Sequence, residues 1–389
     1  MSAIARIEDA IADIAAGKMV ILVDDEDREN EGDFVIAAER VTPESLAFMA
    51  EHGRGLICLA LDGPLCDRLE LQPMAPQNEA RLGTAFTVPI DAVDCQGPAV
   101  SPRNRAHTIL KAIAQDAKPQ DFTLPGHVYP LRARAGGVLV RTGQTEGSVD
   151  LARLAGLVPA GVICEVMEPD GTMARLPSLL AMGERFGIKV VTVADLIEYR
   201  LQKEPLVECQ ARSSLATDYG LFDIAIYRTK VGGGTHAALT FGPIGPEPTL
   251  VRVHRGNLLS DAFGFALSRG RRSLAWAMQA IAQEGRGVLL YLDVDRDGAG
   301  LAQALQSHLE RSAGRPWPPE ANKSNSMDFH EFGVGAQILR DLGLRQIRVL
   351  TNQPMRMRAV SGYGLEITAW LPLGPGDANG PTAPVGSAS

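Results

Sequence analysis

Ten residues near the N-terminus, DDEDRENEGD at 24–33, constrain the fold more than any other segment. Seven of the ten are acids, so the segment repels itself and stays at a surface unless cations or arginines compensate it. A short apolar run lies on each side, Met19 to Val23 and Phe34 to Ala38, and each has the length of a strand. We therefore expect two strands joined by an acidic loop. Carboxylate oxygens suit Mg²⁺, but charge alone favours a solvated hairpin.

Strand-like and helix-like segments alternate along the rest of the chain. Thr42 followed by Pro43 predicts a helix start. The apolar run Leu56 to Leu61 predicts a buried strand, and Gly137 to Arg141 predicts a strand that leads into a glycine turn. This mixture favours an α+β fold, with a layered α/β sandwich as the first domain and a second α+β domain behind it.

The periodic pattern pauses at 200–212, where charges and a proline gather. We therefore place a domain boundary there and expect domains at residues 1–205 and 206–373. The last stretch, 374–389, is rich in Gly, Pro, Ala and Ser and is expected to be a disordered tail.

Charge and cysteine content exclude several classes of protein. The formal net charge of -8 argues against nucleic-acid binding, which needs a basic surface. No apolar run approaches the roughly 20 residues that span a membrane. The five cysteines are widely spread without a C-x-x-C pair, which is typical of reduced thiols. We expect a cytoplasmic protein with no nucleic-acid or membrane partner.

The acidic segment matches, residue for residue, the signature of 3,4-dihydroxy-2-butanone 4-phosphate synthases. Further segments resemble the same family over roughly residues 5 to 200: HGRGLICL (52–59), TAFTV (84–88), KPQDFTLPGHVYPLRARAGGVL (118–139) and AGVICEVMEPDGTMAR (160–175). The resemblance implies conversion of the sugar phosphate D-ribulose 5-phosphate to 3,4-dihydroxy-2-butanone 4-phosphate and formate, a step of riboflavin biosynthesis. It also implies Mg²⁺ or Mn²⁺ as cofactor, carboxylates that transfer protons, and a homodimer with active sites near the interface.

The resemblance also implies roles for individual residues. Glu29 would be a metal ligand, and Gln144 stands where the family has a second one. Glu31, His127 and Glu165 would be catalytic. The substrate would be held by Arg28, Glu29, Asp33, Arg141, Thr142, Gly143, Gln144 and Thr145. Independently of the resemblance, a glycine turn before a helix offers backbone N–H groups to a phosphate, and an adjacent arginine adds a charge-assisted bond.

Two residues depart from the family pattern. Gln144 replaces the His of the R-x-G-H-T-E motif, and Asn104 replaces the usual Asp before Arg105. A glutamine oxygen can bind Mg²⁺, but it is a weaker donor and cannot act as an acid or base. Two interpretations therefore stay open: a working synthase, or a catalytically silent paralogue that regulates or scaffolds riboflavin synthesis.

The second half resembles GTP cyclohydrolase II through RVH (252–254), EGRGVLLYL (284–292), FGVGAQILRDLGL (332–344) and IRVLTNQP (347–354). That family binds zinc through three cysteines, whose positions here hold Asn257, Ser268 and Gly270. The segment 293–297 has gained acids where the family has arginines. We therefore expect no zinc and no cyclohydrolase activity, and expect His254 and His308 to be structural. Dimer stabilisation, tethering of another enzyme and binding of a regulatory ligand remain open roles.

Overall fold

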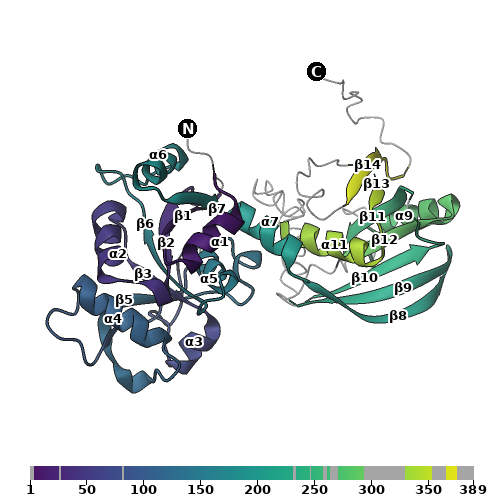
Figure 1. Ribbon diagram of the computed structural model, residues 1–389. Coiled ribbons are helices and arrows are strands. Elements are labelled where there is room, and N and C mark those ends of the chain that lie inside the picture. The colour runs from purple at the N-terminus through teal and green to yellow at the C-terminus, as the bar shows by residue number, and fades with distance from the viewer. Residues whose placement is uncertain are drawn as a thin grey trace, which may run out of the picture. The chain divides into compact units, whose positions relative to one another are not determined.

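The computed structural model describes residues 4–25, 28–80, 83–230, 234–245, 247–256, 261–262, 270–292, 329–352 and 365–374. The chain forms two compact units that divide between Arg200 and Leu201 (Figure 1). This division lies slightly before the predicted boundary at residue 205. Residues 375–389 of the expected tail lie outside the described residues.

The first unit is built on a seven-stranded sheet with the strand order β4-β5-β3-β6-β2-β1-β7. Two neighbouring pairs are parallel, β1 with β7 and β3 with β5, and the other pairs are antiparallel. The strands are β1 (Val20–Val23), β2 (Gly32–Ala37), β3 (Cys58–Leu61), β4 (Ile90–Ala92), β5 (Phe122–Arg132), β6 (Ala160–Glu165) and β7 (Lys189–Thr192).

Helices cover both faces of this sheet, because successive side chains of a strand point to opposite faces. On β1, Ile21 joins a core with Leu46, Ile109 and Leu179, which belong to α2, α4 and α6. Leu22 points the other way, toward α5, which packs beside α1. The predicted α/β sandwich is thus confirmed. The helices are α1 (Ile7–Ala15), α2 (Pro43–Phe48), α3 (Gly63–Arg68), α4 (Pro102–Ile113), α5 (Gln144–Leu154), α6 (Leu176–Phe186) and α7 (Val193–Lys203).

The start of α2 follows the sequence signal. The Thr42 hydroxyl accepts a hydrogen bond from the Ser45 backbone N–H at 3.1 Å, and the Ser45 hydroxyl accepts one from the Thr42 N–H at 3.0 Å. These reciprocal bonds form a capping box, with Pro43 at the first helical position.

The prediction of a strand at 137–141 is wrong. The chain forms a 3₁₀ turn there, at Gly137–Leu139, because a buried ion pair organises it. The Asp150 carboxylate accepts from the Val138 N–H at 2.8 Å, and Arg200 donates to that carboxylate and to the Gly136 carbonyl, both at 2.7 Å. Such tertiary bonds override a local apolar pattern.

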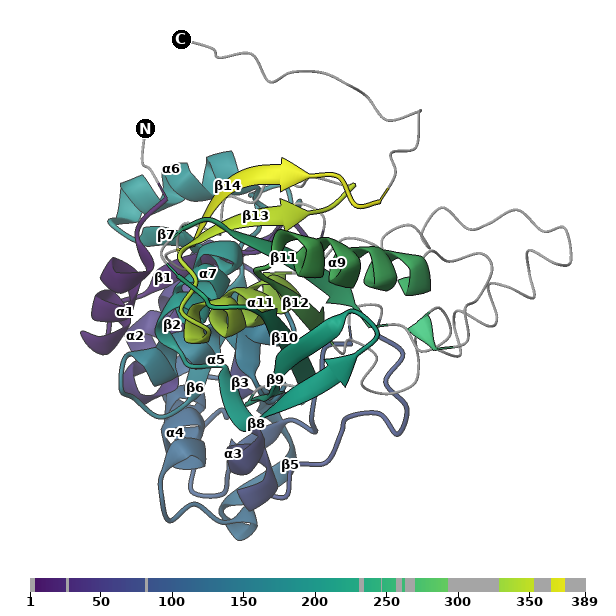
Figure 2. The ribbon, with the colours of Figure 1, turned by 90° about the vertical axis from the view of Figure 1, so that its right-hand side faces the viewer.

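The second unit has its own seven-stranded sheet, in the order β14-β13-β11-β12-β10-β9-β8 (Figure 2). Helices α9 (Gly270–Glu284) and α11 (Phe329–Asp341) pack on it from opposite faces. On β12, Leu289 shares a core with Ile281 of α9, whereas Leu290 faces Gly335 of α11. The strands are β8 (Val207–Thr217), β9 (Gly220–Thr229), β10 (Thr235–Phe241), β11 (Thr249–Arg255), β12 (Gly287–Leu292), β13 (Gln346–Leu350) and β14 (Glu366–Leu371).

Candidate functional site

A pocket of about 130 Å³ lies beside the acidic loop of the first unit. It is smaller than the roughly 300–1,000 Å³ pockets of drug-sized ligands, so it suits a small molecule. Residues from the acidic loop, from β2, β3, β5 and β6, from the start of α5 and from the loop after α3 line it. They are Arg28, Glu29, Glu31, Asp33, Cys58, Thr84, Phe86, Leu131, Arg141, Gln144, Thr145, Ile163 and Glu165.

Asp24, the first residue after β1, organises the acidic loop. Its side chain is fully buried, and its two oxygens accept from the backbone N–H groups of Glu31 at 2.8 Å and Glu29 at 3.3 Å. The same carboxylate pairs with Nη1 of Arg28 at 2.5 Å. A buried charge needs such partners, so the loop is folded around Asp24 and is not merely solvated.

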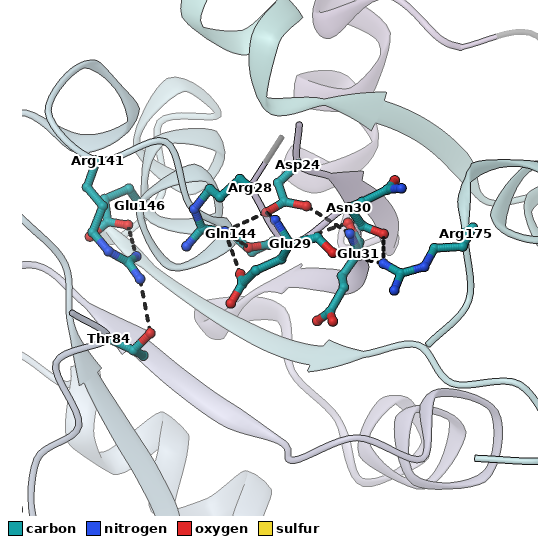
Figure 3. Close-up of polar contacts among 10 residues, drawn as sticks. All are labelled: Asp24, Arg28, Glu29, Asn30, Glu31, Thr84, Arg141, Gln144, Glu146 and Arg175. Carbon is teal, nitrogen blue, oxygen red and sulfur yellow. Dashed lines mark hydrogen bonds and ion pairs between the residues drawn. The ribbon is translucent and has the colours of Figure 1, made fainter. Parts of the chain in front are cut away.

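Arg175, which precedes α6, holds the outer side of the loop. Its guanidinium donates to the Glu29 carbonyl at 2.8 Å and also to the Asn30 carbonyl (Figure 3). Asn30 has a positive φ of 55°, a conformation that asparagine tolerates better than most residues. The guanidinium group of Arg175, which is distant in sequence, therefore holds this side of the acidic loop.

Gln144 joins the acidic loop to α5. Its side-chain oxygen accepts from Arg28 Nη1 at 3.0 Å, and its amide nitrogen donates to the Glu31 carbonyl at 3.4 Å. The residue is buried at the first position of the helix. Because an amide donates and accepts at once, glutamine can hold both the guanidinium and the loop backbone.

A second arginine of the pocket, Arg141, lies just before the start of α5. Arg141 donates to the buried Glu146 carboxylate at 2.6 Å and to the Thr84 hydroxyl at 3.0 Å (Figure 3). Gly143 lies between the arginines: a Cβ there would sit 2.5 Å from Arg141 Nη1 and 3.0 Å from Arg28 Nη2. Only glycine lets both guanidinium groups approach so closely to the N-terminus of α5, where an anion is favoured.

Three carboxyl groups of the pocket have raised pKa values. Asp33 and Glu165 are paired across β2 and β6. Burial, and then the charge of Glu165, raises the pKa of Asp33 well above its usual range. Burial also raises the pKa of Glu165, although the Leu56 N–H bond opposes it. Burial and the neighbouring Glu29 raise the pKa of Glu31. A raised pKa lets a carboxyl group keep its proton at a higher pH than usual, which suits a group that transfers protons.

The charges of the pocket suit a cation. Four carboxylates line it against two guanidinium groups, so acids are in excess. In the described part of the chain, no three His, Cys, Asp or Glu side chains form a ready metal cluster. The oxygens of Glu29 and Gln144 nevertheless converge on one point, which is occupied by Arg28 Nη1. Carboxylate and amide oxygens are donors that a hard divalent cation such as Mg²⁺ uses.

The structure does not bring every predicted site residue into this pocket. Thr142, Gly143 and His127 are absent from its lining, although Gly143 lies close to the lining residues Arg28 and Arg141. His127 is half exposed, and its Nδ1 lies 2.6 Å from the carboxylate of Asp91. Its catalytic role therefore stays a prediction.

Five lining residues have no role in the sequence-based assignment: Cys58, Thr84, Phe86, Leu131 and Ile163. Cys58 lies in HGRGLICL and Thr84 and Phe86 in TAFTV, segments that carry the resemblance, so the signal was present without a function attached. Burial and the nearby Glu165 raise the pKa of the Cys58 thiol. Cys58 therefore lines the pocket as a protonated thiol, which is a poor nucleophile.

Asn104 is used as a donor. Its buried amide donates to the carbonyls of Gln96 at 2.8 Å and Pro98 at 3.0 Å, which holds the loop before α4. We expect Asn104→Asp to lower the free energy of unfolding by about 1–3 kcal/mol, because a carboxylate would face two carbonyl oxygens. Denaturant unfolding of Asn104→Asp and of the exposed Asn78→Asp measures this. Equal effects in both variants would contradict it.

His254 of the second unit lies in a polar network. Nε2 of His254 lies 3.0 Å from the Asp261 carboxylate, which also accepts from the Tyr291 hydroxyl at 3.0 Å. Burial lowers the pKa of His254, which favours its neutral form. The structural role expected for His254 stays a prediction. Asn257, Ser268, the segment 293–297 and His308 lie outside the described residues, and Gly270 starts α9.

Fold and site together define a two-domain α+β protein whose first domain has a small pocket lined by four carboxylates and two guanidinium groups. Protein-family profiles agree: residues 8–199 match 3,4-dihydroxy-2-butanone 4-phosphate synthase, and residues 208–372 match GTP cyclohydrolase II. No helix in the described ranges combines the length and apolar character needed to cross a membrane.

Relatives align with nearly the whole chain. The riboflavin biosynthesis protein RibBA of Aquifex aeolicus is 50% identical to this chain, and the match covers 94% of this chain and 92% of the RibBA sequence. A monofunctional riboflavin biosynthesis protein, RIBA 2 of Arabidopsis thaliana, is 45% identical, covering 95% of this chain and 77% of its own. A similar solved structure is the crystal structure of RibBX, a two-domain 3,4-dihydroxy-2-butanone 4-phosphate synthase from A. baumannii. Its sequence is 41% identical and its TM-score is 0.75, and the match covers 95% of this chain and 99% of the RibBX chain. The chain therefore belongs to the family of riboflavin biosynthesis proteins that join a 3,4-dihydroxy-2-butanone 4-phosphate synthase domain to a GTP cyclohydrolase II domain.

Proposed function

We propose that the first domain converts D-ribulose 5-phosphate to 3,4-dihydroxy-2-butanone 4-phosphate and formate. The observation that carries this proposal is the convergence of eight predicted site residues on one small pocket. They are Arg28, Glu29, Glu31, Asp33, Arg141, Gln144, Thr145 and Glu165.

The phosphate of the substrate is assigned to the space beside Gly143. Arg28 Nη2 and Arg141 Nη1 both border it, and α5 begins at the same place without a side-chain cap for its first backbone N–H groups. Glu146 and Thr84 orient Arg141, so one guanidinium is held ready for a charge-assisted bond.

A divalent cation, Mg²⁺ or Mn²⁺, is assigned to the oxygens of Glu29 and Gln144. When bound, it supplies positive charge to the substrate oxygens and so assists removal of a proton from the neighbouring carbon. Glu31, Asp33 and Glu165 surround the same space, and their raised pKa values let them hold or release that proton.

Formate release from D-ribulose 5-phosphate with Mg²⁺ tests this function, on wild type and on Gln144→His. We expect wild type to turn over and to stop in excess EDTA. Gln144→His is expected to stay within about tenfold of wild type, because the change exchanges an amide oxygen ligand of the cation for an imidazole nitrogen ligand at a cost of about one hydrogen bond.

A second interpretation is a silent paralogue that regulates or scaffolds riboflavin synthesis, and Gln144 is the residue that favours it. In that case wild type would release no formate at any Mg²⁺ or Mn²⁺ concentration. Formate release by Gln144→His alone would mark a silenced active site whose present role lies in binding.

We also propose that the second domain lacks cyclohydrolase activity. From Leu201 onward the sequence has one cysteine, Cys209, so a zinc site of three thiolates cannot form. Zinc content and GTP hydrolysis of the full chain test this. Stoichiometric zinc together with GTP turnover would overturn it.

We propose a homodimer in which His127 serves the pocket of the other copy. His127 lies outside its own pocket lining, is half exposed and is fixed by the buried Asp91, while nearby Leu124 is 59% exposed. If so, Glu29→Ala and His127→Ala are each inactive alone. Their co-refolded mixture should regain about a quarter of wild-type formate release, because half of the dimers are mixed and each mixed dimer has one intact site. No recovery would place His127 in its own chain's site or outside catalysis.

A further inference from the structure

One nitrogen in the pocket is surrounded by three oxygens from separate positions. Arg28 Nη1 lies 2.5 Å from Asp24 Oδ2, 2.5 Å from Glu29 Oε2 and 3.0 Å from Gln144 Oε1 (Figure 3). We call these three side chains the oxygen cage. The Arg28 side chain is only 13% exposed, so the contact is enclosed and not a loose surface pair.

The oxygen cage offers the donors that a hard divalent cation uses: two carboxylates and one amide carbonyl. A cation held by Glu29 and Gln144 requires the volume that Arg28 Nη1 occupies. Two positive charges cannot share one small enclosed space, because their repulsion is poorly screened there. The guanidinium and the cation therefore exclude each other.

We propose that Arg28 and the divalent cation compete for the oxygen cage, so that cation binding releases Arg28 toward the phosphate. This inference rests on the proposed function of the same pocket. Nη2 of Arg28 already borders the space beside Gly143, so a short side-chain movement suffices. Cation binding thus prepares the anion site, so the cation and the substrate phosphate strengthen each other's binding.

The carboxylate of Asp24 needs a positive neighbour, which is either the guanidinium of Arg28 or the divalent cation. This carboxylate is fully buried and keeps its bonds to the Glu29 and Glu31 N–H groups. Without a cationic neighbour the buried charge would be costly. Exchange of the guanidinium for the cation keeps it compensated.

Mn²⁺ binding to the full chain, measured by calorimetric titration without substrate, tests the inference. The variants are Arg28→Gln and, as matched control, Arg141→Gln. Both remove one positive charge from the pocket, but Arg141 is bound to Glu146 and Thr84 and not to the cage. We expect Arg28→Gln to bind Mn²⁺ about tenfold more tightly than wild type, within the range usual for coupled sites, and Arg141→Gln to change by less than about threefold.

A second readout is thermal stability, which does not depend on turnover. Arg28→Gln should melt below wild type in EDTA, and saturating Mn²⁺ should remove most of that difference, because the cation replaces the lost guanidinium beside Asp24. Equal tightening in both variants, weaker Mn²⁺ binding in Arg28→Gln, or a melting deficit that Mn²⁺ leaves unchanged would each overturn the inference. If wild type still binds Mn²⁺ and releases formate, the proposed function survives that failure. Absence of Mn²⁺ binding in every variant would overturn both.

Discussion

Glu29→Ala is expected to lower formate release by about a thousandfold or more. Glu29 is the charged side chain assigned to the cation, and its carboxylate is one wall of the oxygen cage. Removal of one preorganised electrostatic group typically costs a hundredfold to a thousandfold in turnover, and here cation binding is weakened as well. Initial rates with saturating Mg²⁺ and D-ribulose 5-phosphate measure the change.

A matched variant separates this role from general charge loss in the acidic loop. Asp25 lies in the same loop but is exposed and does not line the pocket. Asp25→Asn should therefore keep activity within about tenfold of wild type, which corresponds to roughly 1.4 kcal/mol. If Asp25→Asn loses as much activity as Glu29→Ala, the loop acts through its total charge and Glu29 has no specific role in cation binding.

Asp33→Asn is expected to reduce turnover by about a hundredfold or more while making the protein more stable at neutral pH. Asp33 is buried beside Glu165, and its raised pKa reflects the cost of ionising it in that place. The amide has nearly the same shape, carries no charge and can donate to Glu165. The proton-transfer role is lost with the carboxyl, and so is the repulsion.

The dependence of this stability on pH has a definite sign. The folded-state pKa of Asp33 is raised above the unfolded value of about 3.9. Above the folded pKa the ionised carboxyl therefore destabilises the fold. The destabilisation is relieved as pH falls through the folded pKa and is absent below the unfolded one. Asp33→Asn should consequently show its largest gain in melting temperature at neutral pH and little gain near pH 4. Melting curves in EDTA, which keep divalent cations out of the pocket, measure this.

An exposed aspartate provides the control with opposite sign. The hydrogen bond from Arg132 lowers the pKa of Asp67, so the ionised form is favoured in the fold. Asp67→Asn should leave the melting temperature unchanged or slightly lower at neutral pH. A lower melting temperature for Asp33→Asn at neutral pH would mean that the Asp33 carboxylate is compensated in the fold and that its burial carries no cost.

The sequence by itself determined the fold class and most of the pocket. The acidic decapeptide between two apolar runs predicted two strands and their loop, and the structure has β1 end just before the decapeptide and β2 begin at Gly32 within it. Motif identity was sufficient to select residues as distant as Arg28, Arg141 and Glu165, and all three line one pocket. The site residues were selected through the resemblance to the synthase family, whereas the strands and the start of α2 could be predicted because strand period and capping residues are local properties.

Only the tertiary structure decided how those residues are used. The turn at 137–139 depends on Asp150 and Arg200, and the occupant of the oxygen cage depends on Gln144 reaching Arg28 from a different element. The exclusion of His127 from the pocket lining of its own chain likewise has no local signal. The physical reason is that a hydrogen bond between residues far apart in sequence depends on the packed distance between them, whereas the sequence specifies only which donors and acceptors exist.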